Sequence, residues 1–450
     1  MEAMPELETD FALETVGKID LGHGKLLIPD MNRATTRLLA AALRSFEIDA
    51  HVLPTYKGID LGKKFTSGKE CYPCLVTLGD LLHFIEEEKC RLGRVFDAGR
   101  YVFFMPESDG PCRFGMYNKY QRIVLDSHPE LRTLRISAAT NVDGYSPDGL
   151  VPAEDLLKIR KVSYLAMVLG DVMERFVWRV RPYEKKPGQT DAFAEQAMRR
   201  LQALLERHAA ENPLTRLLAE LDEILDEGRS IIDPRLAPKP RIGIVGEIFL
   251  RMHCESNQDL IRVLERHGAE VVNASMGEWV NYVNYDGLRL ARKSLRQGLK
   301  LFRPSQVKAA MRQVLNFGAT LLYQERIQKK VFRRAQARLD IAGDHRIGHL
   351  EEILKRTGVF SFDIPTEACL SIPGIIHCAR DGYNGVVNVY PFTCMPSTTT
   401  SAVVRPLMHA WRFPYLDAPY DDSCQPNREA AIRTFMFQAQ QHLQRNGRRA

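Results

Sequence analysis

Short runs of consecutive apolar residues recur along the chain, and segments with helical spacing lie between them. Unbroken apolar runs of this length are typical of strands buried on both faces of a parallel sheet. After a tail at 1–24, this alternation predicts an open α/β sheet as a first lobe at 25–150. The expected strands are 25–29, 50–53, 101–105 and 131–137, and the expected helices are 35–46, 75–88 and 117–125.

The second half of the chain repeats this pattern after a helical stretch. Residues 151–235 show helical spacing with little strand signal, and a proline-rich linker leads to residue 241. A second α/β lobe is predicted at 241–450, interrupted by a helical insertion at 287–357. The sequence therefore predicts an α/β protein with two Rossmann-like open-sheet lobes and helical insertions. The strands expected in the second lobe are 241–246, 270–274, 385–390 and 414–418, and its helices are 259–267, 367–380, 398–411 and 428–444.

Composition places the chain among soluble globular proteins and argues against two classes of partner. Of its 450 residues, 45% are hydrophobic and 26% are charged, and the net charge is +6. Basic residues alternate with acids in many places, so we expect no nucleic-acid partner. No apolar run approaches the ~18 residues of a membrane span, so we expect no membrane association. The acidic first fifteen residues lack the pattern of a signal peptide, which favours a cytoplasmic protein.

Cysteine is the residue type most suggestive of chemistry. The chain has nine cysteines, and disulfides are rare in a reducing cytosol. Cysteines in loops rich in glycine and proline are therefore candidates for metal ligands or redox thiols. Cys112 and Cys394 each follow an expected strand, and Cys71 and Cys74 precede an expected helix. In open α/β sheets, ligands bind in the crevice beyond the carboxyl ends of the strands, where helix N-termini attract anions.

Other interpretations of the same cysteines stay open at this point. Cys71-Tyr-Pro-Cys74 before a helix also has the form of a thioredoxin-type dithiol. Structural zinc normally uses two closely spaced Cys-x-x-Cys pairs, whereas the chain has one. Cys254 and Cys424 are reserve ligands near the expected crevice. Nucleotide-binding motifs are absent, since 58–64 lacks the spacing of a P-loop and 241–247 lacks the full dinucleotide fingerprint.

With these segments in view, the chain resembles the acyl-CoA dehydratase activase-related proteins, relatives of the 2-hydroxyacyl-CoA dehydratase and benzoyl-CoA reductase components. The resemblance runs from about residue 25 to residue 437, and Gly-Pro-Cys-Arg-Phe-Gly and Pro-Phe-x-Cys-Met-Pro are its most specific motifs. The matching stretches are 67–74 with 77–80, 104–117, 141–145, 243–248, 277–283 and 391–396.

The resemblance implies a [4Fe-4S] cluster, or in some members a double-cubane cluster, bound here by Cys71, Cys74, Cys112 and Cys394. It further implies low-potential one-electron reduction or radical dehydration, with acyl-CoA or a small reducible molecule as the substrate. ATP hydrolysis would lie in a separate iron–sulfur activator of the actin-like fold. The protein itself would be a possible homodimer or heterodimer.

Several features stay open within this interpretation. Four cysteines would saturate one cubane and favour a non-catalytic electron-transfer or maturation partner, whereas three would leave one iron open for substrate. A Cys71/Cys74 thiol-disulfide protein is a third possibility. Arg113 is a candidate countercharge next to the cluster. Glu247, Glu278 and Tyr117 are further candidates for roles near the site, although each also fits an ordinary structural polar residue.

Overall fold

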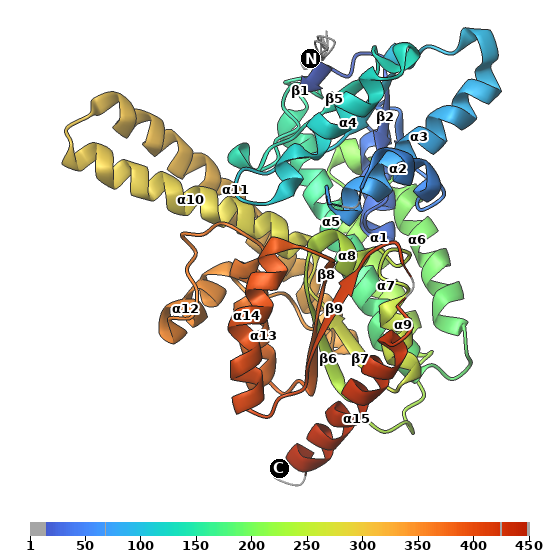
Figure 1. The fold of residues 1–450 in the computed structure, drawn as a ribbon, viewed down its shortest axis with the longest axis vertical. Helices are drawn as coiled ribbons and strands as arrows, with labels where there is room; N and C mark the ends of the chain where they lie inside the picture. The colour runs from blue at the N-terminus through green and yellow to red at the C-terminus, as the bar shows by residue number, and fades with distance from the viewer. Residues whose placement is uncertain (1–14, 68, 424, 448–450) are drawn as a thin grey trace, which may run out of the picture.

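The computed structural model describes residues 15–67, 69–423 and 425–447. It contains one five-stranded and one four-stranded sheet, and every pair of neighbouring strands in them is parallel. Helices surround both sheets (Figure 1). The predicted α/β class with two open sheets is therefore confirmed.

The first sheet has the strand order β1-β5-β4-β2-β3. Alternate residues of its central strands point to opposite faces. Leu27 and Phe103 pack against α3 on one face, whereas Leu26 and Val102 pack on the α1 side. The strands are β1 (Val16–Gly17), β2 (Lys25–Ile28), β3 (Ala50–Val52), β4 (Tyr101–Phe104) and β5 (Arg135–Ser137), and the helices are α1 (Arg33–Arg44), α2 (Ile59–Phe65), α3 (Tyr72–Leu92) and α4 (Tyr117–Asp126).

The second sheet has the order β7-β6-β8-β9 and is likewise covered on both faces. Ile244 and Val387 pack with α9 and α15, whereas Val245 and Val386 pack with α13 and α14. Its strands are β6 (Arg241–Gly246), β7 (Glu270–Asn273), β8 (Gly385–Pro391) and β9 (Tyr415–Tyr420). The surrounding helices are α8 (Ile248–Met252), α9 (Leu260–Arg266), α13 (Ala368–Arg380), α14 (Met395–Ala410) and α15 (Arg428–Gly447).

A helical core joins the lobes. Helices α5 (Leu156–Val180), α6 (Gln189–His208) and α7 (Leu214–Arg229) share one apolar cluster with α1 and the C-terminal half of α11. Helices α10 (Met276–Lys300) and α11 (Pro304–Leu339) form an antiparallel hairpin whose far end projects from the body (Figure 1). The short helix α12 (Ile347–Thr357) then leads back to the second lobe.

Several elements differ from the sequence-based expectation, among them the helices α2 and α8, which the sequence does not predict. Strand β1 lies within the predicted tail, because two residues are too few to produce a hydrophobic pattern. Helix α3 begins at Tyr72 instead of residue 75, so Cys74 lies inside the helix. Helix α10 begins before the predicted insertion, because the Ser275 hydroxyl caps it by accepting a hydrogen bond from the Glu278 N–H at 3.0 Å. No helix in the described ranges is long and apolar enough to cross a membrane.

The contact between Gly58 and Gly79 sets the distance between α2 and α3 and leads to a stability prediction. A Cβ on either glycine would collide with the backbone of the other. We expect Gly79→Ala to lower the free energy of unfolding by about 1–3 kcal/mol, measured by urea denaturation. Gly318→Ala is the control, because a Cβ there has its nearest neighbour at 3.9 Å. Because Gly318 lies in the interior of α11, its replacement by alanine should leave the free energy of unfolding unchanged or raise it by up to ~1 kcal/mol. Equal effects of both substitutions would contradict the proposed close contact.

Candidate metal centre

Three cysteines lie directly before helices that start in different parts of the chain. Cys71 is the residue before α3, and Cys394 is the residue before α14. Cys112 precedes a short 3-10 turn, Arg113–Met116, which runs into α4. The first turn of each helix has backbone N–H groups without helical partners, and these attract negative charge. Each of the three sulfurs is therefore positioned where a thiolate is electrostatically favoured.

Each of these sulfurs lies beside a group that favours its thiolate form. The Phe114 N–H donates to Cys112 Sγ at 3.5 Å. The backbone N–H of Ser397 lowers the pKa of the Cys394 thiol, and the buried Tyr117 hydroxyl lowers the pKa of the Cys71 thiol. Hydrogen bonds to sulfur favour the thiolate form and tune the potential of a cluster that the sulfur binds. The effect of its hydroxyl on Cys71 thus supports the prediction that Tyr117 has a role near the site.

The loops that carry the cysteines contain backbone conformations that side chains rarely adopt. Cys71 has a φ of 111° and Thr393 a φ of 71°. Gly110 has a φ of 123°, and a Cβ there would lie 3.2 Å from the Pro365 carbonyl oxygen. Such conformations cost free energy and persist only where the surrounding structure imposes them. In this protein they shape the loops immediately before Cys71, Cys112 and Cys394.

Arg113 connects the three cysteine loops. Its guanidinium donates to the carbonyl oxygen of Lys69, just before Cys71. It also donates to the carbonyl oxygen of Thr393, just before Cys394, at 2.7 Å. Because Arg113 itself follows Cys112, one side chain links the loops of both lobes. Its charge acts on Cys71 and lowers the pKa of that thiol.

Two glutamates lie near the three cysteines. Burial raises the pKa of Cys71 to about 11 and that of Cys112 to about 12, and it also raises the pKa of Cys394. The negative charges of Glu247 and Glu367 raise the pKa of all three thiols further, so both carboxyl groups lie near each of the three cysteines. Neutral thiols release protons when they bind a metal, so metal binding here is coupled to proton loss.

The two carboxyl groups are themselves held by backbone N–H groups. Glu247 caps α8, where its carboxylate accepts from the N–H groups of Phe249 at 3.0 Å and Leu250 at 2.9 Å. Glu367 Oε1 accepts from the Ile248 N–H at 3.0 Å. The buried Glu367 Oε2 has no hydrogen-bond partner among the described residues. Burial and the nearby Glu247 raise the pKa of Glu367 to about 8, so this carboxyl group can carry a proton near neutral pH.

Cys74 occupies a different environment. It lies in the first turn of α3, fully buried in the apolar core of the first lobe together with Leu78. Burial raises its pKa, and the charges that add to this effect are those of Cys71 and Glu70. The structure thus brings Cys71, Cys112 and Cys394 near the two glutamates and places Cys74 one turn further along α3.

Arg251 is a buried charge that sequence reasoning missed. Its side chain is 3% exposed and donates to the carbonyl oxygens of Gly246 at 3.5 Å and Ser275 at 3.2 Å. It makes no salt bridge with a described carboxylate, yet its positive charge lowers the pKa of Glu247 and Glu367. An arginine in a short helix has no sequence signature of burial, so only the fold could identify it. The predicted reserve ligand Cys254 is exposed, and Cys424 lies outside the described residues.

Two further findings bear on the nature of the site. Among the described residues, no group of three or more His, Cys, Asp or Glu side chains has the spacing needed to hold a single metal ion. A cubane cluster places each cysteine on a different iron atom, so its ligands lie further apart than those of one ion. No known protein-family model matches the chain, and no curated protein matches it.

The link through Arg113 predicts how accessible the site cysteines are. We expect Arg113→Ala to increase the rate at which Cys71, Cys112 and Cys394 react with a thiol reagent by about tenfold, because the loops open locally more often. Mass spectrometry of the labelled peptides measures each rate, with the exposed Cys90 as an internal reference. Arg356→Ala, at an exposed arginine on α12, is the matched control. Unchanged rates for all three site cysteines would contradict a linking role.

Proposed function

We propose that the protein binds a [4Fe-4S] cluster through Cys71, Cys112 and Cys394 and works as the low-potential iron–sulfur component of a reductase or dehydratase. The observation that carries this proposal is that Arg113, next to Cys112, hydrogen-bonds the loops of Cys71 and Cys394 from both lobes, while all three thiols are near the same two buried carboxyl groups. Thiolates are the ligands that hold iron–sulfur clusters. A bound cluster would supply one-electron transfer, which no amino-acid side chain of the site offers.

The protein residues have separate roles in this proposal. Tyr117 and the N–H groups of Phe114 and Ser397 stabilise the three sulfurs as thiolates. Arg113 holds the loops together across the two lobes. The unpartnered Glu367 Oε2 can hold or move a proton beside the thiols, which a reaction that adds an electron and a proton to a substrate requires.

The number of thiol ligands separates an enzyme from an electron relay. Glu247 and Glu367 act on Cys71, Cys112 and Cys394, whereas the charges that act on Cys74 are those of Cys71 and Glu70. This difference favours three ligands, which would leave one iron open to a substrate such as an acyl-CoA or another small reducible molecule. That Cys74 also binds the cluster remains a prediction, and a fully ligated cluster would favour the relay or maturation partner. In either case we propose that a separate ATPase activator delivers the electron.

A thiol-disulfide function of Cys71 and Cys74 has weaker support. Reactive Cys-x-x-Cys pairs work through a thiol whose pKa lies below the ordinary value. Here burial raises the pKa of both thiols. Cys112 and Cys394, in addition, would have no part in such a function.

Iron analysis of cysteine variants tests the cluster and its ligands. After anaerobic purification we expect about four iron atoms per chain, with matching sulfide and a broad absorption near ~400 nm. Cys71→Ser, Cys112→Ser and Cys394→Ser should each lower the iron content to less than about one atom, because each removes a ligand.

The controls in the same series decide between three and four ligands. Cys74→Ser should retain the iron, as should Cys90→Ser at an exposed position on α3. Loss of iron from Cys74→Ser would identify a fourth ligand and favour the relay. An iron-free wild-type protein with a titratable Cys71/Cys74 disulfide would overturn the cluster proposal.

The buried charge of Arg251 predicts a redox effect. We expect Arg251→Gln to make the midpoint potential of the bound cluster more negative, because a positive charge near the site favours the added electron. The expected size is roughly 50 mV, as for one charge acting at an effective dielectric constant of about 20. A redox titration followed by EPR measures the potential, and Arg405→Gln at a largely exposed arginine of α14 is the control. Equal potentials for the wild-type protein and both variants would exclude the role of Arg251.

A further inference from the structure

The α10–α11 hairpin has an unusual charge composition. Between residues 287 and 339 the chain has fourteen lysines and arginines and a single acid, Glu325, giving a net charge of +13. Since the whole chain carries +6, all other residues together carry −7. The basic residues that appear mixed with acids along the sequence are thus concentrated on the α10–α11 hairpin, from its projecting end to its packed end (Figure 1).

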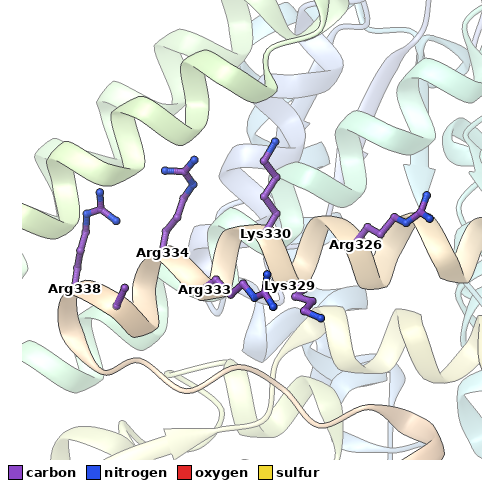
Figure 2. A pocket seen from close by; sticks show the side chains of 7 residues that line it. Arg326, Lys329, Lys330, Arg333, Arg334 and Arg338 are labelled. Carbon is purple, nitrogen blue, oxygen red and sulfur yellow. The ribbon is translucent and has the colours of Figure 1, made fainter.

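Most of this positive charge has no acidic partner. Arg289 and Lys293 pair with Asp363, and Arg334 and Arg338 pair with Asp222 of α7. The other ten make no salt bridge with any described residue. Figure 2 shows six basic side chains on successive turns of α11, where they line a surface hollow.

One face of α11 combines this charge with exposed apolar side chains. Met311, Leu315 and Leu322 are 51%, 68% and 48% exposed. Their spacing of four and seven residues places them on one side of the helix, and the exposed Arg326, Lys329 and Arg333 continue the same side. We call these six residues the outer stripe. An occupant of the stripe needs apolar side chains at one end and negative charge along its length.

The N-terminal segment of the chain has this composition. Residues 1–14 lie outside the described residues. Their sequence has five acids and no lysine or arginine. Apolar residues stand between the acids at Met4, Leu7, Phe11 and Leu13. This segment accounts for most of the −7 carried by the chain outside residues 287–339.

The first described residues include Lys18, whose side chain reaches a loop that contacts α10. Lys18 Nζ lies 2.8 Å from Asp143 Oδ2. The next residue, Gly144, is so close to α10 that a Cβ on it would lie 2.7 Å from Asn284 Oδ1. Across the hairpin, the Phe317 ring of α11 packs on Gly287, so Leu315 and Leu322 lie near the level of Asn284. Fourteen residues span at most about 50 Å, which is ample for the length of the outer stripe.

We propose that the acidic segment 1–14 docks on the outer stripe of α11. Its apolar residues cover Met311, Leu315 and Leu322, and its carboxylates face the unpaired basic residues. Opposite charges on the segment and on the stripe fix the orientation in which the two bind. Two identical hairpins carry like charges and would repel each other, which excludes a contact between them. A nucleic acid would satisfy the charge but would leave the apolar side chains of the stripe uncovered. The inference is independent of the proposed cluster.

Zero-length carbodiimide cross-linking of the full-length protein tests the docking. This reagent joins a carboxylate to an amine only where the two are in contact. At low salt we expect cross-links from the acids of 1–14 to Lys308, Lys329 or Lys330. Their yield should be at least about tenfold higher than to Lys89, Lys239 or Lys355 outside the hairpin, and raising the salt to ~0.5 M should remove most of this excess.

Variants separate specific docking from general charge attraction. Leu315→Ser with Leu322→Ser should lower the cross-link yield by about fivefold, because the apolar contact is lost. Phe437→Ser, at a 60% exposed phenylalanine of α15, is the matched control and should have no effect. Replacing Glu6, Glu8 and Asp10 by lysine should speed amide hydrogen exchange at 311–326.

Two outcomes would overturn the proposal: cross-links spread evenly over lysines of the whole surface, or a yield that the leucine variants leave unchanged. Mixing isotope-labelled and unlabelled protein shows whether the segment and the stripe belong to one copy. We expect cross-links within one copy, because Lys18 reaches a loop that contacts α10. Cross-links only between copies would contradict the docking within one chain.

Discussion

The hydrogen bonds of Arg113 to two carbonyl groups on opposite lobes are the interaction on which the candidate site depends. Each cysteine loop belongs to a separate element, and no sheet hydrogen bond connects one lobe to the other. A single guanidinium presents several donors in a fixed plane, so it can hold two loops at a defined separation, which a lysine could not do. The hydrogen bonds of Arg113 lie near the surface. Burial of the three cysteine loops therefore supplies much of the restraint on the positions of these loops.

The second constraint on the site is electrostatic. Three thiols and two carboxyl groups share a region with little water, and burial favours the neutral form of all five. Hydrogen bonds from Tyr117 and from helix N–H groups, together with the charges of Arg113 and Arg251, act in the opposite direction. The opposition between burial, which favours neutral thiols, and the hydrogen bonds and positive charges, which favour thiolates, suits a metal centre. Binding of iron replaces the protons that keep the thiols neutral and leaves the hydrogen bonds in place.

The sequence predicts the parts of the structure that depend on continuous burial. The runs at 101–105 and 241–246 correspond to β4 and β6, since a strand covered on both faces must be apolar throughout. The loops of Cys112 and Cys394 follow in the same way from the apolar runs at 101–105 and 385–390. Parallel topology then brings the carboxyl ends of neighbouring strands together. The order of the loops along the sequence suggests this arrangement but does not fix the positions of the loops in space.

What the sequence could not predict depends on distant contacts or on single residues. Glu367 joins the site through the N–H of Ile248, which lies 119 residues away along the chain. Arg251 looks like an ordinary helix residue until the packing of its helix is known. The start of α3 at Tyr72 decides that Cys71 precedes the helix while Cys74 lies within it. This one-turn difference separates two cysteines that the sequence alone treats as an equivalent pair.

Charge segregation is a property of the fold that local sequence patterns conceal. Lys329 and Lys330 stand ten residues from Asp340, which in sequence suggests an ordinary mixed surface. In the structure the helix continues to Leu339, so these lysines lie exposed on a stretch, residues 287–339, that has a single acid. The net charge of +13 on this stretch favours an acidic partner by its sign alone, and the exposed leucines of α11 restrict that partner to one with apolar side chains. The acidic and apolar segment 1–14 meets both conditions, and it precedes Lys18, whose partner Asp143 adjoins the residue that packs on Asn284 of α10.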